Sequence, residues 1–267
     1  MMKFATLLRK PPEWMLLDGP HRDIVITSRV RLARNLDGPA FPGFAKKEDR
    51  TTVMQELQPV VEGLPEMKDG FSEDLGGLDA IRKQVLVEKH LISREQAAKS
   101  GGSAAVINRD QSLSIMINEE DHLRMQSIRS GLDLRVAYAA LDRVDEELDG
   151  LVKFAFHPRF GYLTACPTNL GTGMRASAML HLPGLVLSEQ VNQVIAAVNK
   201  IGLAVRGLYG EGTEALANLF QISNQHTLGE REPEIIARLE RVIEQIINHE
   251  RNARRKLVED QPHKVLD

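Results

Sequence analysis

The sequence contains a single cysteine, Cys166, among its 267 residues. An intramolecular disulfide is therefore excluded, and a lone thiol argues strongly against a zinc site built on thiolates. Long apolar stretches are also missing. None approaches the ~18 residues of a membrane span, and residues 1–10 lack the apolar segment and cleavage site of a signal peptide. These absences predict a cytoplasmic protein that does not enter a membrane.

A strong net charge is missing as well. The formal charge is -3 at pH 7, so the chain has no overall attraction to nucleic acid or anionic membranes, and neither is an expected partner. With 42% hydrophobic and 27% charged residues, it has the composition of a globular protein with a sizeable core. Its length suits one large domain or two small ones. Neither a P-loop nor a GxGxxG fingerprint is present, so a bound nucleotide would lack the usual glycine cradle.

The hydrophobic periodicity predicts strands and helices in hairpin-like runs. We expect strands over 23–31, 80–90, 103–108, 112–118, 153–157, 162–165, 176–182, 203–208 and 218–224. We expect helices over 46–64, 131–148, 187–200 and 230–256, and a short helix opened by a capping box at 93–96. Residues 1–22 are interrupted by prolines and a glycine and suit an irregular arm. This order favours an α+β domain with a mainly antiparallel sheet flanked by helices.

Two arginines, Arg29 and Arg31, stand in the first predicted strand. Because alternate side chains of a strand point to the same face, the two guanidinium groups would lie side by side. Two planar, permanently charged guanidinium groups are well suited to binding a phosphate. Taken alone, however, such a pair is more often part of a solvated basic strand, since exposed charge is the norm.

An acidic run follows another predicted strand, in the segment NEEDHLR at residues 118–124. Carboxylates crowded at a strand end are costly unless a cation, a metal or solvent compensates them. An acidic turn on the surface would explain the same composition, so the run by itself leaves both interpretations open.

Two loops carry the remaining candidates. In CPTNLGTGMR, residues 166–175, the loop begins at Cys166 and ends at Arg175 as a strand starts. In RGLYGEGTE, residues 206–214, three glycines would allow a lid to deliver Arg206 and Glu211 to a site. Taken singly, the first loop is equally compatible with an inert thiol, and the second with a flexible surface turn.

The four segments carry more weight together, because each places an arginine at or beside a strand end. Five arginines could surround a triphosphate: Arg29, Arg31, Arg124, Arg175 and Arg206. Two carboxylates could hold a cationic acceptor: Glu120 and Glu211. Phosphoryl transfer requires this combination of positioning and charge neutralisation, with Mg²⁺ bridging the phosphates. No separate metal site made of protein ligands is predicted.

In these motifs the sequence resembles the phosphagen (guanidino) kinase family. CPTNLGTGMRAS at 166–177 is similar to the signature around that family's active-site cysteine, and NEEDHLR is similar to its acidic box. SRVR at 28–31 resembles its phosphate-binding strand, and RGLYGEGTE resembles its mobile loop. The resemblance spans roughly residues 23–251. It implies a fold of the glutamine synthetase/guanidino kinase catalytic-domain type, with ATP and Mg²⁺ as cofactors.

The resemblance also implies roles for individual residues. Glu120 and Glu211 would bind and orient the acceptor guanidinium, one of them as catalytic base. Cys166 would sit beside that guanidinium, as a thiolate if the arginines favour this form. The ATP site would be formed by Thr27, Ser28, Arg29, Val30, Arg31, His90, Arg124, Arg175, Ala176, Ser177, Ala178, Met179, Arg206, Gly207, Leu208, Tyr209, Gly210 and Glu211.

Within the family the chain looks most like bacterial protein-arginine kinases, in RVRLARNL, EKHLIS, RGLYGEGTEA and FQISNQHTLG. This likeness implies phosphorylation of arginine side chains in proteins, with an activator protein, a quality-control protease and a second copy of the chain as candidate partners. Only residues 1–22 precede the catalytic motifs, and an open acceptor site suits an arginine presented by a protein. We expect an N-terminal arm over 1–22, a catalytic domain over 23–251 and a polar tail over 252–267.

Bacterial protein-arginine kinases continue into an extension that binds phosphoarginine, whereas this sequence ends after one predicted long helix and the polar tail. We therefore expect a catalytic domain without that extension, and no allosteric activation through it. Two alternatives stay open. One is a kinase for a free guanidino metabolite such as arginine, and the other is a non-catalytic regulator that binds nucleotide or arginine.

Overall fold

The fold is built on an eight-stranded sheet whose neighbouring strands are all antiparallel. The computed structural model describes residues 1–16, 18–207 and 216–260. The sheet order is β2-β3-β4-β5-β1-β8-β10-β9, and β6 pairs with β7 in a separate hairpin. The strands are β1 (Val25–Arg34), β2 (Phe71–Asp74), β3 (Ala104–Ile107), β4 (Leu113–Ile117), β5 (Leu123–Ser130), β6 (Phe156–His157), β7 (Gly161–Tyr162), β8 (Met174–His181), β9 (Leu203–Gly207) and β10 (Leu219–Asn224).

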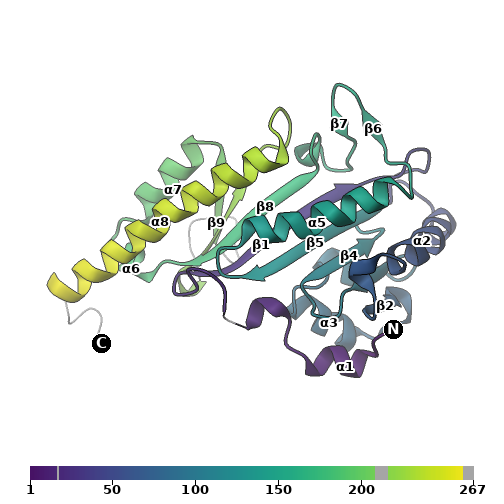
Figure 1. The fold of residues 1–267 in the computed structure, drawn as a ribbon, viewed down its shortest axis with the longest axis horizontal. Coiled ribbons are helices and arrows are strands. Elements are labelled where there is room, and N and C mark those ends of the chain that lie inside the picture. Colours follow the sequence, from purple (N-terminus) through teal and green to yellow (C-terminus); the bar gives the residue numbers. More distant parts are fainter. Residues whose placement is uncertain (17, 208–215, 261–267) are drawn as a thin grey trace.

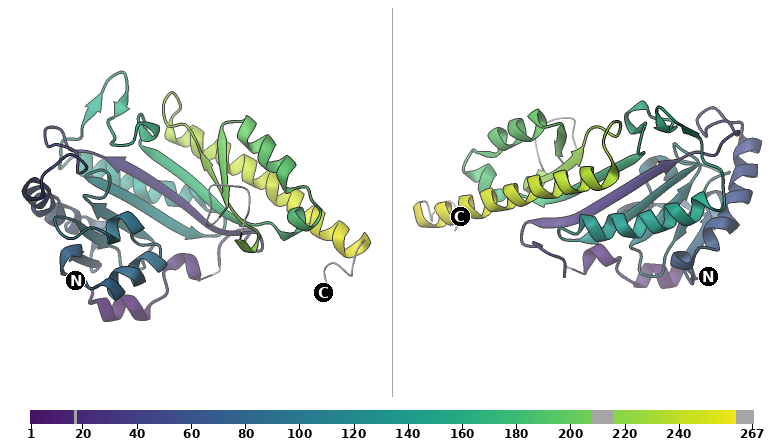
Figure 2. Two further views of the ribbon diagram at one scale, coloured as in Figure 1. Left: turned by 180° about the vertical axis from the view of Figure 1, so that it is seen from behind. Right: turned by 45° about the horizontal axis from the view of Figure 1, so that its top comes forward.

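Helices cover the two faces of the sheet unequally (Figures 1 and 2). The helices are α1 (Phe4–Arg9), α2 (Lys47–Glu62), α3 (Ala80–Glu88), α4 (Arg94–Ala97), α5 (Leu134–Asp149), α6 (Pro183–Leu187), α7 (Val191–Lys200) and α8 (Glu232–Asp260). Helices α2, α5 and α8 share one hydrophobic core with the sheet, whereas α1, α3 and α4 cover only the β2–β4 end of the opposite face. None of the helices in the described ranges combines the length and apolar character needed to cross a membrane.

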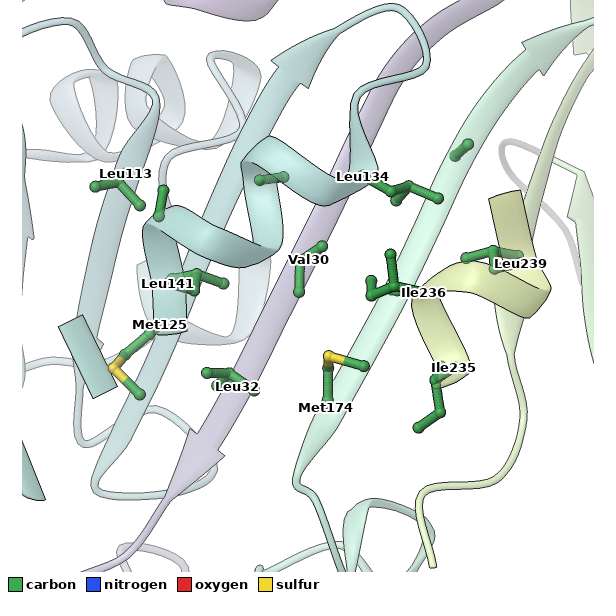
Figure 3. Close-up of a cluster of buried hydrophobic side chains, with 14 of the residues drawn as sticks. Val30, Leu32, Leu113, Met125, Leu134, Leu141, Met174, Ile235, Ile236 and Leu239 are labelled. Carbon is green, nitrogen blue, oxygen red and sulfur yellow. The ribbon is translucent and has the colours of Figure 1, made fainter. Parts of the chain in front are cut away.

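The main core lies between the central strands and helices α5 and α8 (Figure 3). Strand alternation directs every second side chain of β1, β5 and β8 toward these helices. Each fully buried side chain of this kind stabilises the fold by roughly 1.5–3 kcal/mol. The side chains labelled in Figure 3 come from four strands and two helices: Val30, Leu32, Leu113, Met125, Met174, Leu134, Leu141, Ile235, Ile236 and Leu239.

Residues 80–90 were predicted to form a strand, and this prediction is wrong: residues 80–88 form helix α3. The carboxylate of Asp79 accepts a hydrogen bond of 2.8 Å from the backbone N–H of Arg82 and thereby caps the helix. Val85 and Val87 suggested a strand, but only Leu86 of this helix is buried. The local cap and the packing of one helix face override the strand propensity of the two valines.

Several other predicted elements are present but shorter or divided. The helix expected over 187–200 is shortened to α7, which begins at Val191 and follows the short helix α6, and the strands expected over 153–157 and 162–165 shrink to β6 and β7. Ser93 caps α4 by accepting a hydrogen bond from the N–H of Gln96. The Gln96 side chain does not complete the capping box, because it donates to the carbonyls of Ala104 and Ile117 instead.

The first residues of the chain are packed against the body of the protein. Helix α1 brings Leu7, which is fully buried, into a second hydrophobic cluster with Phe71 of β2, Leu86 of α3 and Met116 of β4. At the other end, α8 continues to Asp260 and buries Leu257. The predicted arm therefore contains a helix, and residues 252–260 extend the final helix. The limits proposed for the catalytic domain stay a prediction.

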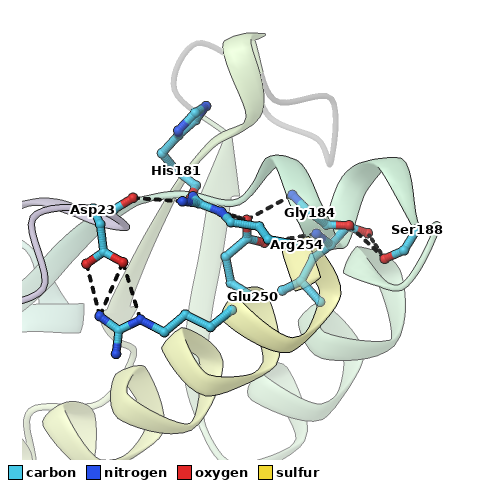
Figure 4. A network of polar contacts seen from close by, with 8 residues as sticks. Asp23, His181, Gly184, Ser188, Glu250 and Arg254 are labelled. Atoms are coloured by element: carbon cyan, nitrogen blue, oxygen red, sulfur yellow. Dashed lines mark hydrogen bonds and ion pairs between the residues drawn. The ribbon is translucent and has the colours of Figure 1, made fainter. Parts of the chain in front are cut away.

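A buried carboxylate joins α8 to α6 (Figure 4). Glu250 is fully buried. It accepts hydrogen bonds from the backbone N–H groups of Gly184 and Leu185 at 2.8 and 2.9 Å, and from Nε of Arg254 at 2.6 Å. Arg254 in turn donates to the carbonyl of Asp23, two residues before β1 begins. The final helix is thus tied to the beginning of the strand that carries Arg29 and Arg31.

Replacing Glu250 with alanine should lower the free energy of unfolding by about 3 kcal/mol, because it leaves two buried N–H groups without an acceptor and Arg254 without its partner. Chemical denaturation monitored by circular dichroism would measure the loss. Glu244 on the same helix is exposed, and the Glu244→Ala variant should stay within about 0.5 kcal/mol of wild type. Equal losses in the two variants would contradict the assigned role of Glu250.

Candidate functional site

The arginines predicted from the sequence lie on the face of the sheet opposite α5 and α8, which is called the arginine face below. In the strand register, Arg31 of β1 lies opposite Arg175 of β8 on one side and Gln126 of β5 on the other. Arg29 lies opposite Ser177. Because Val30 and Leu32 point into the main core, the intervening arginines must point to the other face. Thr27 and Met179 have the same parity and lie on the arginine face.

Four other residues of the predicted ATP site have their side chains on the core face. Val30, Ala176 and Ala178 belong to the main core. The hydroxyl of Ser28 donates to the carbonyl of Gly131 and accepts from the N–H of Asp133. Strand alternation therefore leaves only the backbone of these four residues for contact with a ligand on the arginine face.

A pocket opens on the arginine face. It joins three of the four sequence motifs. The strands β1, β5 and β8 contribute to it, together with the acidic turn (residues 118–122) and the cysteine loop (residues 166–173). Its lining consists of Arg31, Leu32, Ala33, Glu120, Arg124, Cys166, Thr168, Asn169, Gly173 and Arg175. Three cations, one carboxylate and the only thiol of the chain thus meet in one cavity.

Arg29 and Arg31 form no ion pair with another described residue, whereas Arg124 is paired with Glu119. Burial, together with the charges of Arg29, Arg124 and Arg175, holds the pKa of Arg31 well below its usual range. Burial and the charges of Arg124 and Arg175 lower the pKa of Arg29 to about 10. Nε of Arg31 is buried and has no hydrogen-bond partner among the described residues. A polyanion would relieve both the repulsion and the missing hydrogen bond, so the residues present fit a bound triphosphate.

Arg175 links this group to the strand β9. Burial lowers the pKa of Arg175, and the charges of Arg206 and Arg124 lower it further. Arg206 near the end of β9 is exposed, and Gly207 follows it as the last residue of that strand. Leu208, Tyr209, Gly210 and Glu211 lie outside the described residues, so their predicted roles stay predictions.

The acidic run at 118–124 divides into supporting residues and one pocket residue. Glu119 is buried, accepts from Nη1 of Arg124 at 2.6 Å and from Ser93 Oγ at 2.6 Å, and also accepts the N–H of Glu120. Burial acts to raise the pKa of Glu119, but the charge of Arg124 and these hydrogen bonds outweigh it and lower that pKa. Glu119 is therefore an ionised carboxylate that fixes Arg124.

Asp121 and His122, like Glu119, support the acidic turn through hydrogen bonds. Asp121 is buried and accepts from Nδ2 of Asn35 and from the N–H of Ala165, both at 2.6 Å. It thereby joins the acidic turn to the cysteine loop. His122 accepts the N–H of Leu36 through Nδ1, and burial lowers its pKa. These contacts hold the turn in place from both sides.

Glu120 alone of this run presents its carboxylate to the pocket. Its side chain is 47% exposed, and one oxygen lies 3.9 Å from Nη1 of Arg124. Burial raises the pKa of Glu120, and the negative charge of Asp121 adds to this effect. A carboxylate with a raised pKa at the edge of a cationic pocket is suited to orient a cation and to accept a proton from it.

Cys166 stands at the start of the loop that forms one wall of the pocket. Its Sγ lies 3.0 Å from Oγ1 of Thr168. The hydroxyl of Thr227 donates to the carbonyls of Thr168 and Leu170 and holds this loop. Gly173 has a φ of +66° and passes so close to Ala33 that a Cβ would meet its carbonyl oxygen at 2.6 Å. The glycine is therefore required where the loop enters β8.

His90 lies beside the arginine face but is not among the residues that line the pocket. Its backbone is in the left-handed region, with φ of +58°. Its ring centroid is 5.2 Å from that of Trp14, whose Nε1 donates to the carbonyl of Lys89. Burial lowers the pKa of His90, and the charge of Arg29 lowers it further. His90 is therefore neutral near pH 7 and held next to Arg29 by the N-terminal residues.

Some residues of the site were missed in the sequence. Thr168 and Asn169 line the pocket, and their place directly after Cys166-Pro167 was the only available signal. Gln126 was missed because nothing near it in the sequence suggested a site. Its side-chain amide donates a hydrogen bond of 2.6 Å to the carbonyl of His90. Within the described ranges, no group of three or more His, Cys, Asp or Glu residues is arranged to hold a metal ion.

Comparisons with known proteins identify relatives of this chain. A family model described as ATP:guanido phosphotransferase, C-terminal catalytic domain, matches residues 52–253. The protein-arginine kinase of Pelotomaculum thermopropionicum is 48% identical over 257 residues, which cover 95% of this chain and 72% of that protein. The protein-arginine kinase of Geobacillus stearothermophilus is 48% identical over 247 residues, covering 92% of this chain and 68% of that protein.

Solved structures with the same fold include two guanidino kinases. The duplicated taurocyamine kinase of Schistosoma mansoni superposes with a TM-score of 0.76 at 27% identity, over 89% of this chain and 35% of that chain. A lombricine kinase superposes with a TM-score of 0.74 at 25% identity, over 86% of this chain and 67% of that chain. This chain thus spans about a third of the duplicated enzyme.

Proposed function

Because this chain belongs to the ATP:guanido phosphotransferase family, we propose that it transfers the γ-phosphoryl group of ATP to the guanidino group of arginine residues in proteins. The single observation that carries the proposal is the pocket in which Arg31, Arg124 and Arg175 meet Glu120 and Cys166. The protein-arginine kinases that are 48% identical over most of the chain support the choice of protein arginine as acceptor.

The arginine face would bind the phosphates of ATP. Arg29 and Arg31 would contact them from β1, Arg124 from β5, and Arg175 and Arg206 from β8 and β9. Mg²⁺, when bound with ATP, would share in neutralising the charge that develops on the transferred group. Thr27, His90, Ser177, Met179 and Gly207 would border the rest of the nucleotide, together with the backbone of Ser28, Val30, Ala176 and Ala178. The loop residues Leu208, Tyr209, Gly210 and Glu211 complete the proposed set.

The acceptor guanidinium would bind between Glu120 and Cys166. An arginine side chain is protonated at all ordinary pH values, so its nitrogen is a poor nucleophile. Glu120 would align the guanidinium with the γ-phosphate and accept the proton that leaves the attacking nitrogen, while the N–P bond forms and the bond to the leaving ADP oxygen breaks. Glu211 is proposed as the second carboxylate and Cys166 as a further contact of the guanidinium.

Phosphoarginine analysis tests the proposal directly. The purified chain with ATP and Mg²⁺ should phosphorylate arginine in casein, as seen by mass spectrometry under non-acidic handling that preserves the acid-labile bond. Free arginine, creatine and taurocyamine form a second arm, because the structural neighbours include a taurocyamine kinase. Turnover with a free compound and none with protein would replace the proposed acceptor, and nucleotide binding without any turnover would favour a regulator.

Trp14 offers a direct report on nucleotide binding, because it is the only tryptophan of the chain and its ring contacts His90. We expect ATP to change the fluorescence of Trp14 with a saturable dependence on ATP concentration. The His90→Ala variant retains Trp14 and should show a much smaller change at saturating ATP. An undiminished change in that variant would contradict the proposed place of His90 in the nucleotide site.

The family resemblance extends the proposal to the setting of the enzyme. We propose a cytoplasmic location, a catalytic domain over residues 23–251, and an activator protein, a quality-control protease and a second copy of the chain as partners. The homologous protein-arginine kinases support protein substrates in particular. Size-exclusion chromatography with light scattering would test the association of two copies.

A further inference from the structure

A second cleft continues from the proposed acceptor pocket on the side of the acidic turn. It is lined by Glu95, Lys99, Glu119, Glu120 and Arg124. Glu120 and Arg124 also line the pocket that holds Cys166, so the two cavities adjoin. Helix α4 and the turn after it form the outer wall, with Glu95 in the first turn of the helix.

Two charges of this cleft are already matched within the protein. Glu119 is buried and paired with Arg124 at 2.6 Å, so its carboxylate is not available to a further cation. Glu120 faces the pocket and is assigned to the target guanidinium. Glu95 and Lys99 remain, and neither takes part in a side-chain ion pair with another described residue.

Electrostatics favour this cleft as the side from which a cationic acceptor arrives. The other walls of the pocket carry Arg31 and Arg175, which repel a guanidinium until ATP is bound. Burial contributes most to the raised pKa of Glu120, the negative charges of Asp121, Glu119 and Glu95 add to it, and the charge of Arg124 opposes it. The field of Glu95 therefore reaches the carboxylate of Glu120, and the two attract a cation along one path.

We propose that this cleft is a subsite for the polypeptide that flanks the target arginine, in which Glu95 binds a second basic side chain of the substrate. The inference rests on the proposed protein-arginine kinase activity and names its preferred sequence context. Lys99 stands four residues after Glu95 in the same cleft, so it repels the same side chain and limits the preference.

A peptide series tests this subsite. Each test peptide contains one arginine and one lysine. The lysine occupies one of the two positions before the arginine or one of the two positions after it, and the reference peptide has glutamine at all of these positions. The wild type should phosphorylate at least one lysine peptide with a kcat/KM about threefold to fivefold above the reference, mostly through KM, as expected for one partly exposed ion pair.

Three variants test whether Glu95 is responsible for the lysine preference. Glu95→Gln should abolish the lysine preference without changing kcat on the reference peptide, and Lys99→Gln should increase the preference. Glu56 is exposed on α2, on the other face of the sheet, and Glu56→Gln should leave the preference unchanged. Equal rates of the wild type on all peptides, or an unchanged preference in Glu95→Gln, would overturn the subsite alone. No phosphoarginine on any peptide or on casein would refute the proposed function, and the subsite with it.

Discussion

Replacing Glu120 with glutamine is expected to lower kcat by about 10²–10⁴-fold, the usual contribution of a positioned general base, while thermal stability stays close to wild type. The carboxylate is 47% exposed, and its one ion-pair contact is 3.9 Å from Arg124, so the fold depends on it little. Glutamine keeps the size of the side chain but can neither take the proton nor attract the guanidinium. Phosphoarginine formation at saturating ATP and acceptor would measure the loss.

Glu119 is the matched control, because it is the neighbouring residue with the opposite environment. It is buried and holds Arg124, Ser93 and the N–H of Glu120. Glu119→Gln should lower the free energy of unfolding by about 3 kcal/mol, because it leaves Arg124 uncompensated in a partly buried site. If the Glu119 variant kept wild-type stability and the Glu120 variant unfolded, the division of the acidic run would be wrong.

The pH dependence of wild-type activity provides a second check on Glu120. A base acts in its deprotonated form, and burial with the charge of Asp121 raises the pKa of Glu120 above its ordinary value. Activity should therefore fall as the pH drops through this raised pKa, at a higher pH than an ordinary glutamate would give. The residual activity of Glu120→Gln should lack this acid limb. An acid limb that persists unchanged in the variant would assign it to another group.

Replacing Arg31 with methionine should lower kcat/KM by about 10²–10³-fold, the typical effect of removing one donor to developing charge, without lowering the stability of the free protein. The charged form of Arg31 is disfavoured by burial and by Arg29, Arg124 and Arg175, and its Nε has no partner among the described residues. A group whose pKa is lowered on folding reduces stability throughout the pH range in which it is charged. Removing it should therefore leave the unfolding midpoint equal or higher.

Arg34, on the same strand, should respond in the opposite sense. It is 1% exposed, donates to both oxygens of Asp145 at 2.9 and 2.6 Å, and stacks on Tyr162 at 3.5 Å. Arg34→Met should lower the free energy of unfolding by about 3 kcal/mol, because it leaves the largely buried carboxylate of Asp145 without its cation. Thermal unfolding of both variants with and without ATP would measure the contrast. A destabilised Arg31→Met protein would show that Arg31 is structural.

Much of the fold could be predicted because its signals are local. The alternation in 23–31 placed Arg29 and Arg31 on one face, and the structure confirms a strand there with both residues on the face opposite the core. The periodicity of 230–256 predicted the long helix, which is present as α8. The strand predicted over 80–90 failed because Val85 and Val87 have strand propensity, while the cap at Asp79 decides for a helix.

The candidate site was predicted less completely. Its motifs were visible as short charged segments, but nothing in NEEDHLR distinguished Glu120, which faces the pocket, from Glu119, which is buried beneath it. Ser28 and Val30 were assigned to the ATP site with their neighbours, although alternation sends their side chains to the core face. Gln126 gave no signal, because its role depends on a carbonyl 36 residues away in the chain.

The sequence by itself determined the chemistry available to this protein: five arginines, acidic groups and one thiol in four motifs of the guanidino kinase type. These signals are local, because residue type and the two-residue period of a strand are written in consecutive positions. Only the tertiary structure decided which of these groups meet. Three of the four motifs join in one pocket because β5, β1 and β8 are adjacent in the sheet. Burial, which depends on contacts between distant segments, then divides the charges into those that support the site and those left for a ligand.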